Sequence, residues 1–281
     1  MNMRNAGLAA VVVAAAVLSA CSNGAAPKPW ADVTPSPVGV TETVGETAPV
    51  WQDVAGQGVV RRDDPAKGGD QWSPVPIPGI KIGRLSDTDP SGTAKCTLGP
   101  AVAGGFLTAG HCADGKAGTE QYAQVHPDGS APLDLGVTEP AQGVDAAVIR
   151  TAVAPGATRI AGTWPVAGVL TAKGVQQLVP VGSMICFDGA VSGVRCGKRV
   201  ADDGEMVVRV SSTHGDSGAP VFVVDDQSRA ALLGILRDGD GSETGVTSLD
   251  AALLATGTAV QLDPDTVAFD GPGFSRWIAL K

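Results

Sequence analysis

Short apolar runs separated by turn residues are the feature that most constrains the fold of this chain. From Gly79 onward such runs recur, and they include IKIG, GFLTAG, AAVIR, EMVVRV, APVFVV and ALLGIL. Glycine and aspartate lie between them, and the chain of 281 residues contains 38 glycines and 20 prolines. Runs of this length between turn residues are typical of β-strands, and their recurrence is typical of a sandwich or barrel. We therefore predict an all-β domain.

One segment departs from the strand pattern. Residues Thr247 to Ala255, TSLDAALLA, place apolar side chains at helical spacing behind a serine or threonine that can cap a helix, and Gly257 follows. Capping residues before such a run and glycine after it are typical of helix ends. We predict a short helix near the C-terminus.

The N-terminus has the pattern of an export signal. Arg4 precedes a fifteen-residue apolar run that ends at Ala20, which is too short to span a bilayer comfortably. The run ends in LSAC, which resembles the lipobox of bacterial lipoproteins, in which the cysteine is lipidated. We expect residues 1–20 to be a signal peptide and lipidated Cys21 to bind the membrane. The alternative is cleavage near Ala26 and free secretion.

Residues 21–77 differ from the rest of the chain in composition. They contain AAPKPW, TPSPVGV and WSPVPIPG and few apolar runs of strand length. Such a segment buries too little surface to offset its ordering entropy, and as a coil it would reach roughly 40 Å. We expect a lipid-anchored tether, with the folded domain at residues 78–281. A pro-segment removed near Arg61-Arg62 is the competing interpretation.

Charge and composition exclude some partners. The net charge is −9, and no basic cluster is larger than Arg61-Arg62. Nucleic acid binding requires a basic face, so we expect no nucleic-acid partner. No CxxC or HxxxH spacing is present, and we therefore expect no metal.

The cysteine count agrees with export. If Cys21 carries lipid, the other four of the five cysteines form an even set, which suits disulfides in an oxidising compartment: Cys96, Cys112, Cys186 and Cys196. Four cysteines allow three pairings. Cys96 with Cys112 and Cys186 with Cys196 close short loops, each contributing roughly 3 kcal/mol.

The stretch HGDSGAP, residues 214–220, places a serine between glycines directly before the apolar VFVV. A serine hydroxyl becomes a good nucleophile when a base takes its proton, and that base is most often a histidine. His111 ends the apolar run LTAGHC, whereas His126 precedes the turn sequence PDG. His214 lies too close to Ser217 in sequence to be the preferred base, and we expect it to line the site.

A buried carboxylate must orient that histidine. Asp145 directly precedes an apolar strand in GVDAAVIR, whereas four other candidates lie in glycine-rich turns: Asp114, Asp128, Asp202 and Asp203. The alternative for Asp145 is a turn residue that caps the strand. We predict a catalytic set of His111, Asp145 and Ser217.

Four motifs together resemble the chymotrypsin-like serine proteases, and more closely the bacterial streptogrisin group. They are CTLG with LTAGHC, VDAAVI, ICFDGAVSGVRCG, and GDSGAPV followed by LLGIL, and they cover about residues 79–262. The resemblance implies two six-stranded antiparallel β-barrels that meet near residues 160–175, with the site between them. It also implies peptide or protein substrates and no cofactor.

The resemblance implies a role for each matching residue. His111 would be the general base and then the acid, Asp145 the orienting carboxylate, and Ser217 the acylated nucleophile. The backbone N–H groups of Gly215 and Ser217 would form the oxyanion hole, each worth roughly 3 kcal/mol.

One position near Asp216 departs from the family pattern. The resemblance implies that Asp216 is a buried anchor in an ion pair. The streptogrisin group has an arginine directly after the first cysteine of the second bridge, and Phe187 occupies that position here. We expect Arg195 to replace it.

The resemblance also places the substrate pocket. Ser211 would lie at its base, Gly239 and Gly245 on its walls, and His214 beside it, while Arg237 replaces the usual serine. No carboxylate lies at the base, so we expect a neutral pocket for small or medium apolar side chains.

Together these observations predict a monomeric, exported serine endopeptidase of the bacterial cell envelope. The order of the residues excludes an α/β-hydrolase, in which the histidine follows the serine, because no histidine follows Ser217. The alternative from another class is a catalytically silent protease-like binding domain, which Phe187 and Arg237 keep open.

Overall fold

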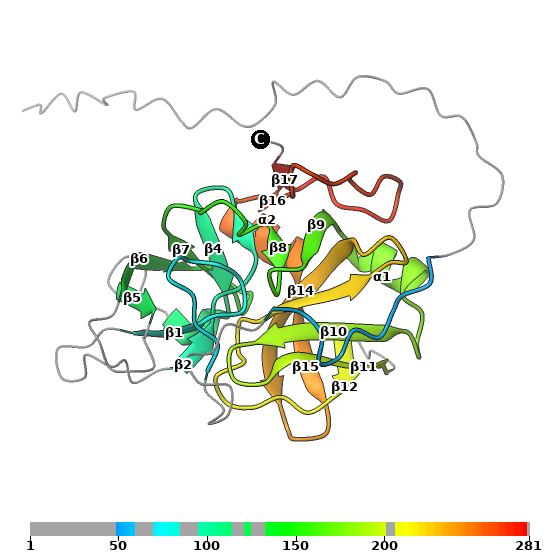
Figure 1. Ribbon diagram of the computed structural model, residues 1–281, viewed down its shortest axis with the longest axis horizontal. Coiled ribbons are helices and arrows are strands. Elements are labelled where there is room, and N and C mark those ends of the chain that lie inside the picture. Colours follow the sequence, from blue (N-terminus) through cyan, green and yellow to red (C-terminus); the bar gives the residue numbers. More distant parts are fainter. Residues whose placement is uncertain are drawn as a thin grey trace, which may run out of the picture. The chain divides into compact units, whose positions relative to one another are not determined.

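The computed structural model describes residues 49–59, 70–84, 95–113, 121–124, 133–200 and 206–279 (Figure 1). The predicted signal peptide and Cys21 lie outside these residues. No helix among the described residues combines the length and hydropathy needed to cross a membrane.

The first sheet is formed mainly by the N-terminal half of the described chain. Its strand order is β17-β16-β3-β4-β7-β6-β5-β1-β2, and all neighbours are antiparallel except β16 and β17. The strands are β1 (Lys81–Arg84), β2 (Lys95–Thr97), β3 (Ala101–Val102), β4 (Gly105–Thr108), β5 (Gln121–Gln124), β6 (Leu133–Pro140), β7 (Ala147–Arg150), β16 (Val260–Gln261) and β17 (Ile278–Ala279). The two C-terminal strands extend this sheet to nine strands in the described part of the chain.

The second sheet contains a closed barrel. Its order is β13-β10-β11-β12-β15-β14-β9-β8, and β13 also pairs with β14, so β10 to β15 close into a six-stranded barrel. The strands are β8 (Arg159–Ile160), β9 (Trp164–Val169), β10 (Met184–Gly189), β11 (Gly193–Arg199), β12 (Met206–Arg209), β13 (Pro220–Val224), β14 (Ala230–Gly239) and β15 (Thr244–Ser248). This mostly β architecture agrees with the predicted chymotrypsin-like fold.

The apolar run after the serine motif forms a strand that is buried on both faces. All five residues of β13 are buried. Val221 and Val223 belong to one core cluster, whereas Phe222 and Val224 belong to another, because successive side chains of a strand point to opposite faces. The continuous apolar sequence of β13 therefore anchors the preceding turn between two cores.

The predicted C-terminal helix is present as α2 (Leu249–Thr256). Ser248 is its N-cap residue, and Gly257 ends it in the left-handed conformation with φ of 64°. Helix α1 (Ala172–Leu178) was not predicted from the sequence, and a hydrogen bond of 2.9 Å from Gly174 N to Thr171 Oγ1 caps its first turn.

Two disulfides connect the pairs that close short loops. Cys96 in β2 is bonded to Cys112, and Cys186 in β10 is bonded to Cys196 directly opposite it in β11. Both agree with the pairing that the sequence analysis favoured.

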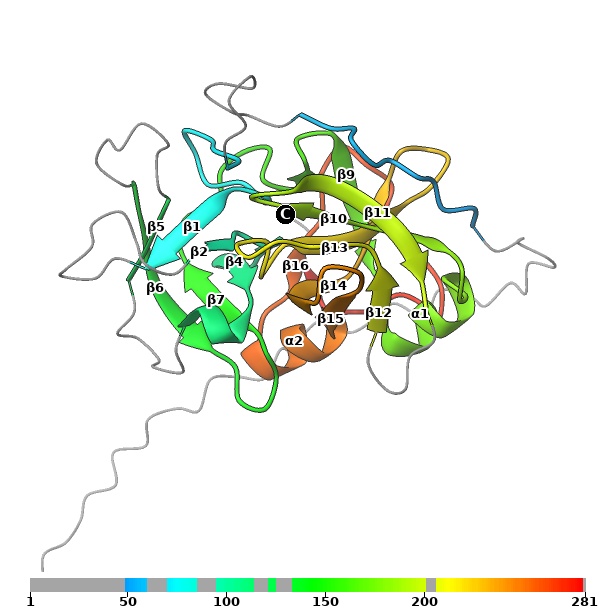
Figure 2. The same ribbon diagram turned by 90° about the horizontal axis from the view of Figure 1, so that it is seen from below.

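Part of the expected tether is packed against the barrel formed by β10 to β15, which we call the second barrel. We call residues 49–59 and 70–79 the N-terminal strap. Trp51 is buried and donates from Nε1 to Leu178 O at 2.6 Å, and Val54 lies in a core cluster. Figure 2 shows residues 49–59, in blue, running along β9 and β11. Trp51 and Val54, which the sequence analysis assigned to the tether, are therefore packed against the domain expected at residues 78–281.

The residues that follow residue 262 contact the strap through an aromatic cluster. Phe269 and Phe274 stack with ring centroids 5.0 Å apart, and Trp51 contacts Phe269 edge to face at 6.3 Å. Dispersed contacts hold the strap, among them the buried side chains of Trp51, Val54 and Gln71, so no strand-length apolar run was present to predict its packing.

Candidate active site

The ends of two paired strands bring His111 and Asp145 together. Thr108 at the end of β4 is paired with Ala147 at the start of β7. His111 follows β4 in a 3-10 turn (Gly110–Ala113), whose Cys112 is bonded to β2. Asp145 lies two residues before β7. The strand register and the disulfide therefore position the imidazole against the carboxylate.

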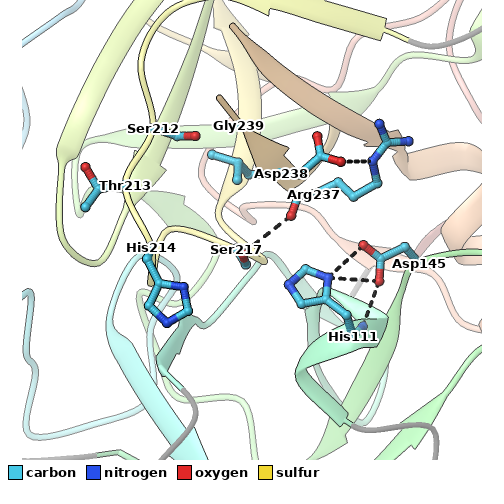
Figure 3. A pocket seen from close by; sticks show the side chains of 10 residues that line it. His111, Asp145, Ser212, Thr213, His214, Ser217, Arg237, Asp238 and Gly239 are labelled. Atoms are coloured by element: carbon cyan, nitrogen blue, oxygen red, sulfur yellow. Dashed lines mark hydrogen bonds and ion pairs between the residues drawn. The ribbon is translucent and has the colours of Figure 1, made fainter. Parts of the chain in front are cut away.

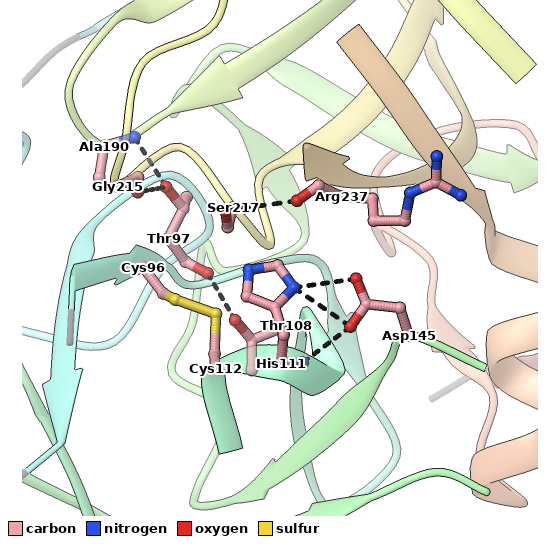
Figure 4. Close-up of a disulfide and its surroundings, with 10 residues drawn as sticks. All are labelled: Cys96, Thr97, Thr108, His111, Cys112, Asp145, Ala190, Gly215, Ser217 and Arg237. Atoms are coloured by element: carbon pink, nitrogen blue, oxygen red, sulfur yellow. Dashed lines mark hydrogen bonds and ion pairs between the residues drawn. A yellow bond between two sulfur atoms is a disulfide. The ribbon is translucent and has the colours of Figure 1, made fainter. Parts of the chain in front are cut away.

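His111 and Asp145 interact through three contacts. Nδ1 of His111 lies 2.9 Å from Oδ2 and 3.2 Å from Oδ1 of Asp145, and the backbone N–H of His111 donates to Oδ1 at 2.7 Å. A carboxylate on Nδ1 leaves Nε2 as the ring atom that can accept a proton. In Figures 3 and 4 the imidazole lies between Asp145 and Ser217.

The same contacts shift both pKa values. The hydrogen bond to Asp145 raises the pKa of His111 above 6.5, against the opposing effect of burial, and the negative charge of Asp238 adds to the rise. Burial by itself would raise the pKa of Asp145, but the hydrogen bonds from His111 and the charge of Arg237 outweigh it and lower that pKa. Asp145 therefore remains ionised and stabilises a protonated imidazole.

The turn that carries Ser217 requires glycine on both sides. Gly215 has φ of 106° and Gly218 has φ of 91°, a region that other residues rarely adopt. A Cβ at Gly218 would also collide with Thr108 Oγ1 and Thr97 O. These constraints explain why glycine brackets the serine in HGDSGAP.

Thr97 of β2 connects the first sheet to this turn (Figure 4). Its N–H donates to Ser217 O at 2.7 Å, and its hydroxyl donates to Gly215 O at 2.8 Å. The same hydroxyl accepts a hydrogen bond of 2.9 Å from Ala190 N. Because Thr97 follows the disulfide-bonded Cys96, the bridge that positions His111 also supports the serine turn.

The predicted ion pair of Asp216 with Arg195 is wrong. Asp216 is fully buried, whereas Arg195 is exposed on β11. Four groups donate to the Asp216 carboxylate: Val191 N at 3.1 Å and Ser192 N at 3.0 Å to Oδ1, and Ser192 Oγ at 2.6 Å and Thr213 N at 2.8 Å to Oδ2. Hydrogen bonds of this kind stabilise a carboxylate without a cation. Phe187 is buried in an apolar core cluster.

A pocket of about 530 Å³ joins these groups (Figure 3). Its lining residues are His111, Asp145, Ser212, Thr213, His214, Ser217, Leu236, Arg237, Asp238 and Gly239. Among the described residues, the Ser217 hydroxyl hydrogen-bonds with Arg237 O at 3.4 Å and not with His111. Catalytic hydrogen bonds are often long or poorly aligned before substrate binds.

Three of the five residues expected in the substrate pocket line this pocket. His214, Arg237 and Gly239 line the pocket, but Ser211 and Gly245 do not. The carboxylate of Asp238 covers Gly245, since a Cβ there would collide with it. Ser211 lies one residue before the lining stretch.

Four lining residues were missed by the sequence analysis: Ser212, Thr213, Leu236 and Asp238. Each adjoins a residue that was predicted, so proximity to the motif was the available signal. Arg237 Nε forms an ion pair of 2.9 Å with Asp238 Oδ2. The pocket wall therefore contains a pair of opposite charges, of which only Arg237 was predicted.

One cluster of side chains that could in principle bind a metal lies among the described residues, but its composition does not suit a metal site. Cys96, His111 and Cys112 have potential ligand atoms within 4.8 Å of one another. Both cysteines are in a disulfide, which leaves one imidazole, whereas structural zinc sites use four ligands and catalytic sites three.

Comparisons with known proteins find matches in structure. No family model matches the chain, and no curated protein matches it significantly in sequence. Chymotrypsin from Cellulomonas bogoriensis is similar at 23% identity and a TM-score of 0.47, covering 66% of this chain and 97% of that protein. Protease A from Thermobifida fusca is similar at 23% identity and a TM-score of 0.48, covering 66% and 98%.

A third similar structure is a glutamic acid specific serine protease described as using a histidine triad in substrate binding. It is 21% identical with a TM-score of 0.48, and the match covers 66% of this chain and all of that protein. Similarity at this level of identity concerns the fold alone.

Proposed function

We propose that this chain is a serine endopeptidase that hydrolyses peptide bonds through an acyl-enzyme on Ser217. The observation that carries the proposal is the His111–Asp145 pair, with Nδ1 2.9 Å from Oδ2, in the same pocket as Ser217. A nucleophile, a base and a group that orients the base are the parts that acyl transfer requires.

Each residue would have a defined task. Ser217 Oγ attacks the carbonyl carbon while Nε2 of His111 takes its proton, and Asp145 stabilises the resulting imidazolium. The carbonyl electron pair moves to oxygen, where the N–H groups of Gly215 and Ser217 would stabilise it. The imidazolium then protonates the leaving amine as the C–N bond breaks, and water repeats the sequence to release the acid.

The test is hydrolysis of a peptide library by the full chain. We expect cleavage that is lost in Ser217→Ala. Cleavage that persists in this variant would contradict the proposed nucleophile. The library also tests the preference for small or medium apolar side chains, which cleavage only after lysine or arginine would contradict.

A catalytically silent binding domain is the second candidate. One observation favours it, because the Ser217 hydroxyl bonds to Arg237 O in place of the imidazole. A fluorophosphonate probe separates the two candidates, since it reacts only with an activated serine. Labelling that disappears in Ser217→Ala supports the peptidase, and no labelling of the folded chain supports the binding domain.

We also propose that the protein is exported and anchored to the bacterial envelope through lipid on Cys21. The signal-like sequence of residues 1–20 supports this proposal, and two disulfides suit an oxidising compartment. Cys21→Ala is expected to move the protein from the membrane fraction to the soluble fraction. An unchanged distribution would contradict the anchor.

A further inference from the structure

Gln71 in the N-terminal strap contacts three successive residues of the second barrel. Its side-chain Nε2 donates to Asp188 Oδ1 at 2.6 Å and to Gly189 O at 2.8 Å, and its backbone N–H donates to Ala190 O at 2.6 Å. Gln71 is only 5% exposed. An amide side chain has two N–H donors, and both are used here. One residue of the strap therefore holds the end of β10 and the first residue of the β10–β11 turn.

The same turn holds Asp216. After Ala190, the next two residues provide three of the four donors to the Asp216 carboxylate, namely Val191 N, Ser192 N and Ser192 Oγ. Asp216 directly precedes Ser217 in the chain. Contacts therefore run without a gap from Gln71, through the β10–β11 turn, to the backbone that carries the nucleophile.

Gln71 is itself held by the first sheet. Its carbonyl accepts a hydrogen bond of 2.9 Å from Lys81 N in β1, and the Lys81 ammonium forms an ion pair with Asp70. Strand β1 pairs with β2, and Ile82 of β1 lies opposite Cys96 of β2. Gln71 therefore connects β1 to the β10–β11 turn and parallels the link that Thr97 makes from β2.

We propose that Gln71 is a positioning residue for the oxyanion turn, Gly215 to Ser217, and that the strap segment from residue 70 onward belongs to the working protease. This inference rests on the proposed function. Gln71 acts through the β10–β11 turn and does not touch substrate. Gln71 would control the direction in which the N–H groups of this turn point. Oxyanion donors stabilise a transition state only when they already point at the developing charge.

The test compares Gln71→Met with Gln52→Met in the full chain. Methionine has a similar length to glutamine but no donor, and Gln52 is an exposed glutamine of the same strap. We expect Gln71→Met to lower kcat roughly ten- to a hundredfold with KM nearly unchanged, because misplacement acts mainly on the transition state. Gln52→Met should match the parent. A merely structural role for Gln71 would lower the melting temperature and leave kcat of the folded fraction unchanged.

Hydrogen exchange tests the positioning independently of activity. We expect Gln71→Met to speed amide exchange in residues 189–193 and 213–218 and to leave β14 unchanged. If the parent chain has no peptidase activity, the proposed function fails, and this exchange result alone then decides the positioning role. Parent-like kcat and exchange in folded Gln71→Met would overturn the inference.

A second variant covers the case in which Gln71→Met does not fold. Gln71→Asn keeps the amide donors but shortens the side chain by one methylene group, and it is examined with the same two measurements. Parent-like kcat and exchange at residues 189–193 in this variant would overturn the inference, and lower kcat with faster exchange would support it.

Discussion

The two halves of the candidate site are held in different ways. The serine turn of the second barrel surrounds a fully buried Asp216 that accepts four hydrogen bonds. In the turn that follows β4 of the first sheet, the side chain of His111 is 49% exposed, and its described polar contacts are with Asp145. The nucleophile is therefore held by hydrogen bonds around its backbone turn, whereas the described polar contacts of the base are with one residue.

This difference fits the chemistry that each half would perform. An oxyanion hole requires backbone N–H groups that already point at one place, so a turn held from several sides suits it. A base must gain and lose a proton during the reaction, and its pKa depends on the carboxylate beside it. Substitutions in the first half should therefore change proton transfer, and substitutions in the second should change geometry and stability.

The largest expected effect is on the base. His111→Ala should lower kcat on the order of 10⁶-fold, because the imidazole is the group proposed to take the serine proton. The melting temperature should change little, since half of the side chain is exposed. Peptide hydrolysis measures the first and thermal unfolding the second. His126→Ala, at a histidine outside the described residues, is the matched control and should keep full activity.

In the second half of the site, the largest expected effect is on the way the free energy of unfolding depends on pH. Burial raises the pKa of Asp188 to about 7 in the folded state, and the nearby charge of Asp216 adds to this, against a hydrogen bond from Gln71. Unfolded, the group ionises near 3.8. The folded state then binds more protons between these values, so stability falls as pH rises from about 4 to 7.

Asp188→Asn removes this dependence while keeping an oxygen that can accept from Gln71. We expect the variant to be more stable than the parent at pH 8, by up to about 4 kcal/mol, and similar to it at pH 4. Urea unfolding at the two pH values measures the difference. An equal gap between variant and parent at both values would show that Asp188 does not titrate in this range.

Thr97→Val breaks the connection between the two halves. Loss of the hydroxyl removes two hydrogen bonds of the parent, the one that Thr97 donates to Gly215 O and the one that it accepts from Ala190 N. We expect a loss of roughly 2 kcal/mol in stability, with a lower kcat, because unsatisfied buried groups are costly. Chemical unfolding and steady-state kinetics measure both effects. A variant that loses stability but keeps kcat would show that the turn does not depend on this link.

The smallest expected effect is that of a charge in the second half, Asp238, on the pKa of His111 in the first half. The charge of Asp238 contributes to the raised pKa of His111. The base must be neutral, so activity rises as pH increases through that pKa. Asp238→Asn should move this acid limb to lower pH without abolishing activity. The pH profile of kcat/KM measures the shift, and the exposed Asp226, changed to Asn, is the control.

The sequence predicted those parts of the site that local patterns encode. Ser217 stands out because glycine positions and a buried strand surround it, and Asp145 stands out as a charge before an apolar strand. The helix α2 was predicted from its caps, whereas α1, seven residues with an internal glycine, had no comparable pattern. A short-range sequence pattern was sufficient to predict the structure of those segments whose conformation depends mainly on their own residues.

The parts that were missed depend on contacts between distant segments. Gln71 lies in a proline-rich stretch and is 117 residues from its partner Asp188. The donors to Asp216 are mostly backbone N–H groups, which every residue has, so no side-chain pattern could indicate them. Arg195 was chosen for its charge, although the carboxylate needed donors and not a cation.

The measurement that tests the central claim most directly is the pH dependence of fluorophosphonate labelling, with the modified residue mapped by mass spectrometry. We expect a single adduct on Ser217 of the folded full chain. Its rate should rise with pH as His111 loses its proton, and the adduct should be absent in Ser217→Ala. No adduct, or an adduct at another serine, would contradict the convergence of the two halves into one catalytic site.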